Sequence, residues 1–523
     1  MLRALSVSLT LLVVASLWNG VSTGADAELS ADVVVYGGTA SGVVAAVAAA
    51  REGKSVVLVE PGRHLGGMVS GGLGATDTGN RACIGGYSRE FFQRVREHYV
   101  KEYGADSQQV KDCSDGFRFE PHVAAEVFDD MIGEARVPVV IRHRLVEVKK
   151  AGGRIQSIDC AEQAEAGRKV TRFHGKVFID ASYEGDLLAR AGVQYVIGRE
   201  GRSQYNEALA GVQARSPAHQ WPVPVPGRDE AGKLLPCIQN EPLAEPGTGD
   251  RKVQAYNFRL CMTNRKDNLV PWPKPAGYDP KRYELLARYL ARKPDLKLAQ
   301  LCNPVRVPND KTDTNNNGAF STDHIGANWD YPDGDAETRK TIWLDHIEYT
   351  QGFFWFLAHD PRVPKALQDE VNSWGLARDE FTDTNHWPHQ LYVREARRMI
   401  GEYVMTQADI MDNRLKGDSV GLGSYNTDSH HVQRVLDRDG NVLNEGDFQV
   451  GVRPYAIPYR SLVPKREQCT NLLVPVCCSA SHVAYGTIRM EPVYMILGQA
   501  SGVAASLACS DGLDVQAVPV PKL

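Results

Sequence analysis

The residues best suited to acid–base chemistry lie late in the chain. The segment GSYNTDSHHVQR, which begins at Gly423, gathers polar groups without helical or strand periodicity, so we expect a loop that could line a site. His430 is a better candidate there than His431. Further on come His482, Tyr485 and Arg489. A histidine or tyrosine can move a proton and an arginine can fix an anion, whereas the alternative for such a histidine is a structural role.

A nucleotide-binding pattern precedes these groups near the start of the chain. The sequence VVVYGGTASGVVAAVAAAREGKSVVLVE, from Val33 to Glu60, predicts a strand, a tight turn, a helix and a second strand that ends on an acid. Gly37 would allow the turn and Gly42 the close packing of the helix, whose first amides would hold a pyrophosphate. Glu60 would bind ribose hydroxyls and disfavours NADP. Thr39 replaces the middle glycine of G-x-G-x-x-G, and an ordinary βα turn is the alternative.

Two other segments point to the same kind of site. From His64 the chain reads HLGGMVSGGLGATDTG, and its paired glycines indicate backbone that lies flat against something bulky. The segment KVFIDASYEGDL predicts an apolar strand that ends on Asp180 before a helix. The alternative for Asp186 in this segment is a helix cap.

Together with IGGYSREFFQRV, these motifs resemble the FAD-dependent oxidoreductases of the glutathione-reductase-like flavoprotein superfamily, and more narrowly a secreted bacterial branch often labelled xanthan lyase. The resemblance implies FAD as cofactor. It assigns the ADP part to Gly37, Gly38, Ser41, Gly42 and Glu60, the approach to the flavin to Gly66, Gly67 and Met68, and further cofactor contacts to Asp180, Ser182, Gly185 and Asp186.

The resemblance also assigns roles to the last helix, which starts near Pro492. Its N-terminus would point at the flavin, and its segment with Gly498, Gln499 and Gly502 would pack against the first strand–helix unit. His482 would take a substrate proton while hydride leaves to flavin N5, with Tyr485 beside it. Arg489 would fix an anionic group or the flavin itself.

The expected fold is α/β: a Rossmann-like FAD-binding fold, a parallel sheet with helices, plus an inserted α+β substrate domain with an antiparallel sheet. The expected division is a signal peptide at 1–27, the first part of the FAD-binding domain at 28–197, a substrate domain at 198–440, and the C-terminal part of the FAD-binding domain at 441–523. A second G-x-G-x-x-G is missing from the sequence, which argues against a built-in NADH site.

Composition narrows the class of protein. The 523 residues are 43% hydrophobic and 24% charged with a net charge of −5, as in a soluble globular protein with no reason to bind nucleic acid. The N-terminus predicts a signal peptide, from Arg3, the apolar stretch to Leu17 and a small-residue cleavage site near Ala27. The apolar stretch is too short for a stable membrane span, so we expect export to the periplasm or the outside.

Ten cysteines in a chain this long do not form a disulfide scaffold. The adjacent pair Cys477 and Cys478 is either a strained redox ring or core filling.

Several other elements follow from periodicity and turn residues. We expect a hairpin around Ala151-Gly152-Gly153. The expected helices are 87–103, one starting near Pro121, 343–359, 390–411 and one from Arg489; the expected strands are 253–263, 455–462 and 471–476. Arg394, Arg397 and Arg398 in the fourth helix would either be solvated or face an acidic sugar. The segment DTNNNG from Asp313 resembles a calcium loop that lacks its final glutamate, or forms a polar loop over the active site.

The predicted function is dehydrogenation of a small polar substrate, a sugar or sugar acid, by hydride transfer to FAD, with an unidentified electron acceptor. One alternative is a xanthan-type polysaccharide lyase that uses His430, Tyr485 and Arg489. The other is a redox-inactive glycan-binding protein on the same fold. His64 or Cys83 could carry a covalent flavin, although neither stands in an attachment motif.

Overall fold

A seven-stranded sheet takes strands from both ends of the chain. In this computed structural model, which describes residues 27–163, 169–412 and 416–523, its order is β3-β2-β1-β6-β5-β4, with β20 beside β6. The predicted signal peptide lies outside the described residues except for its last position. The pairs among β3, β2, β1, β6 and β20 are parallel, and the hairpin of β4 and β5 is antiparallel. The strands are β1 (Ala27–Tyr36), β2 (Val56–Val59), β3 (Val139–Val140), β4 (His143–Ala151), β5 (Arg154–Glu162), β6 (Val170–Asp180) and β20 (Leu472–Leu473).

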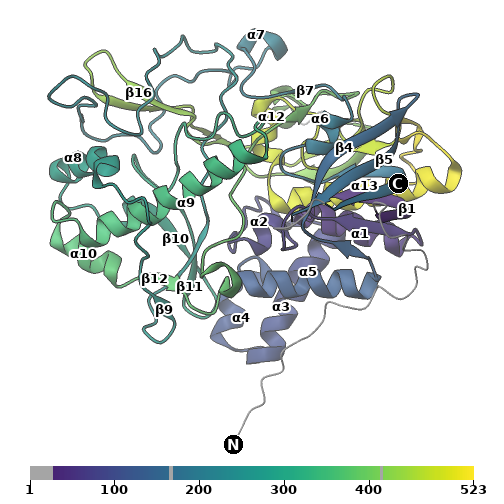
Figure 1. The fold of residues 1–523 in the computed structure, drawn as a ribbon, viewed down its shortest axis with the longest axis horizontal. Coiled ribbons are helices and arrows are strands. Elements are labelled where there is room, and N and C mark those ends of the chain that lie inside the picture. Colours follow the sequence, from purple (N-terminus) through teal and green to yellow (C-terminus); the bar gives the residue numbers. More distant parts are fainter. Residues whose placement is uncertain (1–26, 164–168, 413–415) are drawn as a thin grey trace, which may run out of the picture.

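Helices from both chain ends pack on this sheet. Figure 1 shows the purple β1 and α1 (Ala40–Arg51) beside the yellow α13 (Glu491–Asp511). Small residues allow the close contact: a β-carbon on Gly502 would meet the carbonyl oxygen of Ala45. Among the described helices, α13 is long and apolar enough to cross a membrane, but 67% of that stretch is buried inside the protein, as expected for a core helix. Nearby lie α2 (Gly67–Ser70), α3 (Gly86–Tyr103), α4 (Gln108–Asp112), α5 (Pro121–Ala135) and α6 (Asp186–Arg190).

A second, antiparallel sheet stands beside the first layer. Its order is β10-β11-β8-β12-β9, and Figure 1 shows the long helix α9 and helices α8 and α10 around it. This combination of a parallel and an antiparallel sheet confirms the predicted fold class, whereas the domain boundaries stay predictions. The elements are β8 (Leu260–Thr263), β9 (Leu269–Val270), α8 (Glu284–Arg292), β10 (Cys302–Val307), β11 (Lys311–Asn316), α9 (Ala336–His359), α10 (Lys365–Asn372) and β12 (Gly375–Ala377).

Short elements complete the described chain and connect the two sheets. They are β7 (Tyr195–Val196), α7 (Arg202–Tyr205), β13 (Arg398–Met399), α11 (Gln407–Met411), β14 (Ser419–Gly423), β15 (Thr427–Ser429), β16 (Gln433–Leu436), β17 (Val442–Glu445), β18 (Phe448–Val450), β19 (Tyr455–Pro458) and α12 (His482–Ile488). The polar segment after Gly423 thus contains a short strand, β15, and His482 and Tyr485 lie on a helix.

The predicted helix over 390–411 is wrong. The segment contains only β13, which pairs with β7, and the five-residue α11. Its arginines are buried and not on a solvated face: Arg394 is 1% exposed and Arg398 is 0% exposed. Arg398 lies 2.9 Å from a carboxylate oxygen of Glu200. Ion pairs with distant parts of the chain therefore override the helical spacing of these side chains.

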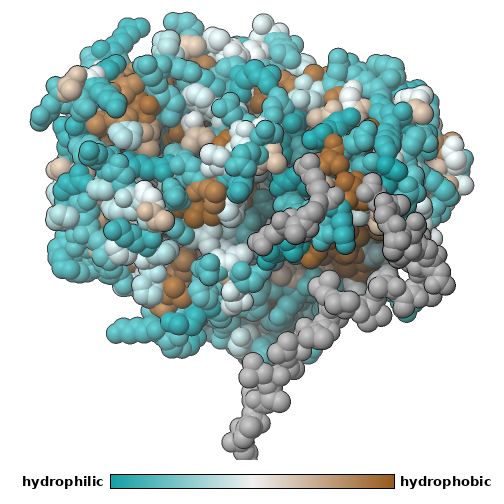
Figure 2. All heavy atoms as spheres, viewed as in Figure 1, coloured by the Kyte–Doolittle hydropathy of each residue, from teal (hydrophilic) through white to brown (hydrophobic). Residues whose placement is uncertain are grey.

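The surface of the molecule shows no broad apolar face in the view of Figure 2, where apolar side chains form small separate patches among hydrophilic ones. The large hydrophobic side chains that are exposed among the described residues are scattered: Tyr103, Leu243, Leu344 and Leu422. Single exposed apolar residues are ordinary on soluble proteins.

Candidate functional site

The turn between β1 and α1 requires two of its glycines. Gly37 has φ +98°, a conformation that favours glycine, and a β-carbon there would lie 2.6 Å from the backbone nitrogen of Ser182. A β-carbon on Gly42 would overlap the carbonyl oxygen of Gly37. The turn thus brings the first amides of α1 to the carboxyl edge of the parallel strands, where open α/β sheets bind nucleotides.

Thr39, at the position of the middle glycine, fits this turn. It is the N-cap of α1 with φ −63°, a value that any residue can adopt. Its hydroxyl accepts a hydrogen bond from the Gly42 amide at 3.2 Å and donates one to the Ala181 carbonyl at 2.8 Å. The side chain is turned into the protein and caps the helix.

Glu60 stands beside the same turn, at the end of β2. One carboxylate oxygen accepts a hydrogen bond from the Gly38 amide at 2.6 Å, and the other accepts one from the Gly62 amide. Burial raises the pKa of Glu60 to about 7, although the two amides oppose this. The acid is therefore held in place at the edge of the nucleotide crevice.

Segments distant in sequence meet at this turn, and we call the residues 37–42, 60, 66–68, 181–183 and 491–502 the nucleotide cradle. Tyr183 links three of them: its hydroxyl accepts a hydrogen bond from the Met68 amide at 2.9 Å and donates one to Glu491 at 2.6 Å. Gly498 packs against Ser41. The Ser41 hydroxyl and the second carboxylate oxygen of Glu491 are buried without a hydrogen-bond partner among the described residues. Such atoms are rare in folded proteins and indicate a missing polar partner.

Two acids predicted to lie near the cofactor are engaged elsewhere. Asp180 is fully buried and accepts hydrogen bonds from Ser182 and from the Leu188 amide, so it organises the turn after β6. Asp186 pairs with Arg339 at 2.7 Å and Arg397 at 2.8 Å. Asp186 therefore joins α6 to α9 and to the segment before β13, and its side chain does not cap α6.

The second glycine cluster packs against protein rings. A β-carbon on Gly66 would meet the ring of Phe128, and one on Gly67 would meet the hydroxyl of Tyr183. On the side of the backbone where a β-carbon would stand, the bulky neighbours that these glycines predict are therefore aromatic side chains of the protein. Gln499 accepts a hydrogen bond from the Tyr87 amide at 2.7 Å and ties α13 to α3. Pro492 lies in the first turn of α13, as predicted.

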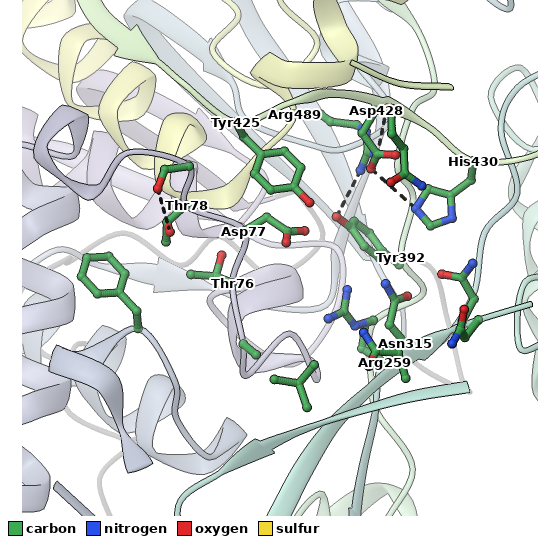
Figure 3. A pocket seen from close by; sticks show the side chains of 18 of the residues that line it. Thr76, Asp77, Thr78, Arg259, Asn315, Tyr392, Tyr425, Asp428, His430 and Arg489 are labelled. Carbon is green, nitrogen blue, oxygen red and sulfur yellow. Dashed lines mark hydrogen bonds and ion pairs between the residues drawn. The ribbon is translucent and has the colours of Figure 1, made fainter. Parts of the chain in front are cut away.

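A polar cavity of about 590 Å³ opens next to the cradle. Part of its wall is residues 75–79, which directly follow the second glycine cluster, and another part is Arg489, which lies two residues before α13. Figure 3 shows the side chains of Asp77 and Tyr425 pointing across the cavity toward Tyr392 and His430. The volume is in the range of small-molecule sites.

His430 is held in this cavity by a buried carboxylate. Its Nδ1 lies 2.7 Å from Oδ2 of Asp323, and its Nε2 lies 3.8 Å from Oδ2 of Asp428. Burial alone would raise the pKa of Asp323, but Arg394 and His430 outweigh it and hold the pKa at about 2. Burial lowers the pKa of His430. The pair is therefore an ionised aspartate with a neutral histidine, whose Nδ1–H is bonded and whose Nε2 is a free base.

Two arginines of the cavity wall, Arg489 and Arg259, are each paired with an aspartate. Arg489 donates to Asp428 at 2.8 Å and to the Tyr392 hydroxyl at 3.2 Å, and its Nε is buried without a hydrogen-bond partner among the described residues. Arg259 makes two hydrogen bonds of 2.7 Å to Asp313. Donors and acceptors thus alternate on this part of the wall, which suits a ligand rich in hydroxyl groups.

His482 and Tyr485 are not among the described residues that line the cavity. His482 is 1% exposed, its Nδ1 bonds to Glu395 at 2.8 Å, and its Nε2 has no partner in the described part of the chain. The Tyr485 hydroxyl lies 2.7 Å from that of Tyr494. The structure therefore brings His430 and Arg489 together and leaves the other two predicted catalytic side chains in the core, and their roles stay predictions.

Sequence reasoning missed most of the cavity wall. Asp77 follows the glycine cluster directly, and that position was a usable signal. Asp323 lies 107 residues from His430, and nothing in the sequence pairs them. Arg259 and Tyr392 lie in segments that read as a strand and a helix, where only the tertiary fold shows which side chain faces inward.

The structure does not support a calcium loop at Asp313 or a redox-active pair at Cys477 and Cys478. Asp313 lies in β11, 1% exposed, and both of its oxygens bond to Arg259, so it offers no ligand to a cation. Cys477 and Cys478 are both free and fully buried. Burial raises the pKa of Cys477 well above its ordinary value and that of Cys478 to about 12, so both are inert thiols that fill the core.

One carboxylate cluster has the spacing of a metal site. The ligand atoms of Glu120, His122 and Glu380 lie within 4.8 Å of one another. However, the ammonium of Lys311 lies 2.7 Å from both glutamates, and its side chain is 0% exposed. The lysine supplies the positive charge that these buried acids need.

His64 and Cys83 stay predictions as sites of covalent flavin attachment. His64 bonds to Asp383 at 2.7 Å and stacks on His389, with ring centroids 4.0 Å apart. Cys83 ends a short 3₁₀ helix and is partly exposed.

Comparison with known proteins gives one strong match. Residues 32–523 match the model of a family described as FAD dependent oxidoreductase. No curated protein sequence matches the chain.

Solved structures match over about a third of the chain. They include 3-ketosteroid-Δ4-(5α)-dehydrogenase from Rhodococcus jostii RHA1, at 17% identity over 34% of this chain and 52% of that one, with a TM-score of 0.21. Thermovibrio ammonificans THI4 matches at 17% identity over 33% and 67%, with a TM-score of 0.23. The anhydrotetracycline hydroxylase OxyS from Streptomyces rimosus matches at 11% identity over 38% and 43%, with a TM-score of 0.25. The chain thus spans about half the length of the first of these proteins.

Proposed function

Because the chain belongs to the family of FAD-dependent oxidoreductases, we propose that it dehydrogenates a sugar or a sugar acid in the polar cavity. The observation that carries this proposal is the Asp323–His430 pair, which presents a neutral imidazole nitrogen among hydroxyl-binding groups. The electron acceptor that restores the cofactor is not specified by these groups.

The nucleotide cradle fits the ADP part of FAD. It combines the amide-rich start of α1, an acid at the end of β2, and two buried polar atoms without partners, on Ser41 and Glu491. Glu60 would hold the ribose, and the amides at the start of α1 that are not bonded within the turn would hold the pyrophosphate. Bound FAD supplies the two-electron acceptor that oxidation of an alcohol requires.

His430 supplies the base. Oxidation of a secondary alcohol removes the hydroxyl proton together with a hydride from carbon, and Nε2 of the neutral imidazole can accept that proton. Asp323 bonds to Nδ1, fixes the tautomer and stabilises the imidazolium that forms. Because Asp323 remains ionised, its support is available throughout the physiological pH range.

The remaining wall orients the substrate. Arg489 and the Tyr392 hydroxyl would hold hydroxyl groups near His430, while Asp77 would accept from another hydroxyl on the opposite side. Burial raises the pKa of Asp77, although the nearby Arg259 opposes this. A carboxylate of a sugar acid would be met by Arg81 and Arg118, which are exposed parts of the lining.

The structure does not place all three groups of the lyase alternative in the cavity wall. Its proposed set was His430, Tyr485 and Arg489, and Tyr485 is 1% exposed and bonded within the core. We therefore favour the dehydrogenase.

Anaerobic reduction of the bound flavin by candidate sugars tests the proposal. Bleaching by a sugar or sugar acid in the wild-type protein, and its loss in His430→Gln with the flavin still bound, is the expected result. Bleaching that proceeds equally well in both proteins would remove His430 from the reaction.

We also propose that the protein is exported, because residues 1–27 have the pattern of a signal peptide. Cell fractionation followed by N-terminal sequencing tests this, and a cytoplasmic protein that retains its first residues would contradict it.

A further inference from the structure

A second, smaller cavity adjoins the first. It measures about 310 Å³ and is lined by residues that include Gln220, Pro222, Tyr289, Leu296, Gln300 and Asn317. Tyr289 comes from α8, and Gln300 ends the 3₁₀ helix Leu298–Gln300. No role in the reaction proposed above uses these residues, and the volume is near the lower limit of small-molecule sites.

The two cavities share a wall. Asn317 lines both of them, and the consecutive residues His219 and Gln220 line the first and the second cavity respectively. The two wall segments are joined directly, because the Gly318 amide donates a hydrogen bond to Nδ1 of His219 at 3.0 Å. The two cavities therefore meet at Asn317, which a ligand that spans both would have to pass.

Amide side chains run along this path. In the first cavity Asn303 and Asn315 lie opposite each other on β10 and β11, and Asn317, Gln300 and Gln220 continue the series into the second. In the second cavity, Gln220 and Asn317 already donate to the Asn444 and Ala299 carbonyls, whereas Gln300 accepts from the Lys297 amide and keeps its NH2 group for a ligand. That donor is neutral, and pH does not change it. Asn315 and Asn317 belong to the DTNNNG segment that the sequence singled out as a polar loop.

The second cavity also has an apolar floor. Tyr289 and Leu296 line the cavity and are otherwise buried, at 3% and 4% exposed, and Tyr289 is fixed edge-on against Trp221, with ring centroids 5.1 Å apart. Lys293 is the one ionisable cation in the lining, and it lies 3.5 Å from Asp295. A floor of apolar carbon with amides at its side complements a ring that has C–H faces and neutral hydroxyls.

We propose that the second cavity is a subsite for a neutral sugar unit, so that the substrate is a disaccharide or a longer glycan. Its reacting unit lies at His430 and the adjoining unit lies on Tyr289. The identity of the reacting unit rests on the proposed function, but the presence of the subsite does not.

The test compares matched pairs of ligands. Ligand-observed saturation-transfer NMR and anaerobic flavin reduction are measured with glucose, cellobiose and maltose, and with mannose and β-1,4-mannobiose, on the wild-type holoprotein. At least one disaccharide is expected to bind about tenfold more tightly than its monosaccharide. Gln300→Ala and Tyr289→Leu are expected to bring that ratio close to one, whereas the exposed Gln156→Ala, on β5, is expected to preserve it.

The outcomes separate the two proposals. A disaccharide preference that depends on Gln300, without flavin reduction, supports the subsite and contradicts the proposed function. Flavin reduction by monosaccharides without any disaccharide preference supports the function and overturns the subsite. Binding of none of these sugars overturns the subsite, and a disaccharide preference that survives in both variants places the second unit elsewhere and also overturns it.

Discussion

Replacing Asp323 by asparagine isolates the contribution of one charge to the proposed base. The change keeps the size of the side chain and a possible hydrogen bond to His430, but it removes the negative charge 2.7 Å from Nδ1. It also leaves the guanidinium of Arg394, now 3.1 Å from that position, without its counter-ion. Both changes disfavour the imidazolium.

The magnitude follows from the hydrogen bond. A bond to a charged partner contributes about 1.5 to 3 kcal/mol and a neutral one about 0.5 to 1.5, so the loss is about 1 to 1.5 kcal/mol. That difference corresponds to about one pKa unit, by which the pKa of His430 is expected to fall. The rate constant for substrate-dependent flavin reduction should drop at least about tenfold, and up to about 10⁴-fold if the imidazole also changes tautomer.

Two assays check this reasoning. Activity in the wild-type protein should be lost as the pH falls through the pKa of His430, which burial holds below its ordinary value, and in Asp323→Asn this loss should shift to lower pH. Nitrogen NMR of labelled histidine reports the tautomer without any substrate. The matched control is Asp159→Asn. This change removes the charge of Asp159 on β5, which is bonded to Arg172 on β6. A reduction rate within about twofold of wild type, with an unmoved pH profile, would refute the role of Asp323.

Lys311→Met is expected to destabilise the fold by about 3 to 5 kcal/mol, because it leaves buried carboxylates without their cation. The exposed Lys365→Met should change the stability by less than about 1 kcal/mol. Thermal unfolding compares the two variants, and a similar loss of stability in both would contradict the role of Lys311. Above pH 7, where Glu60 is ionised, Glu60→Gln is expected to weaken FAD binding about tenfold or more, since a charged hydrogen-bonding group worth about 1.5 to 3 kcal/mol is lost. Flavin fluorescence measures the affinity. An unchanged affinity would show that the nucleotide does not use Glu60. Cys477 and Cys478 should resist alkylation until the protein unfolds, as mass spectrometry can show, and rapid labelling of the native protein would contradict their burial.

The parts of the fold that the sequence predicts well are those whose signals are local. The strand–turn–helix unit at Gly37, the helix that starts at Pro121 and the hairpin at Gly152 all depend on neighbouring residues, and all are found. The predicted strands over 253–263 and 471–476 are much shorter than expected, β8 and β20, because their other residues make tertiary contacts and not ladder pairs.

The predictions failed where distant charges decide the structure. The arginines near Arg394 have helical spacing, but each is buried and forms an ion pair with an acid from another segment, such as Asp323 or Glu200. The candidate site shows the same limit. His430 and Arg489 could be chosen by residue type, whereas Asp323, which gives His430 its function in our account, has no sequence signal that links it to the site.

The visible absorption spectrum of the protein, produced as residues 28–523, during anaerobic titration with sugars and sugar acids tests the central claim most directly. We expect the bands of bound oxidised FAD, their loss on addition of a substrate, and a His430→Gln variant that keeps the bands but loses the response. A protein that stays colourless after incubation with FAD, or a variant that bleaches as fast as wild type, would contradict the account.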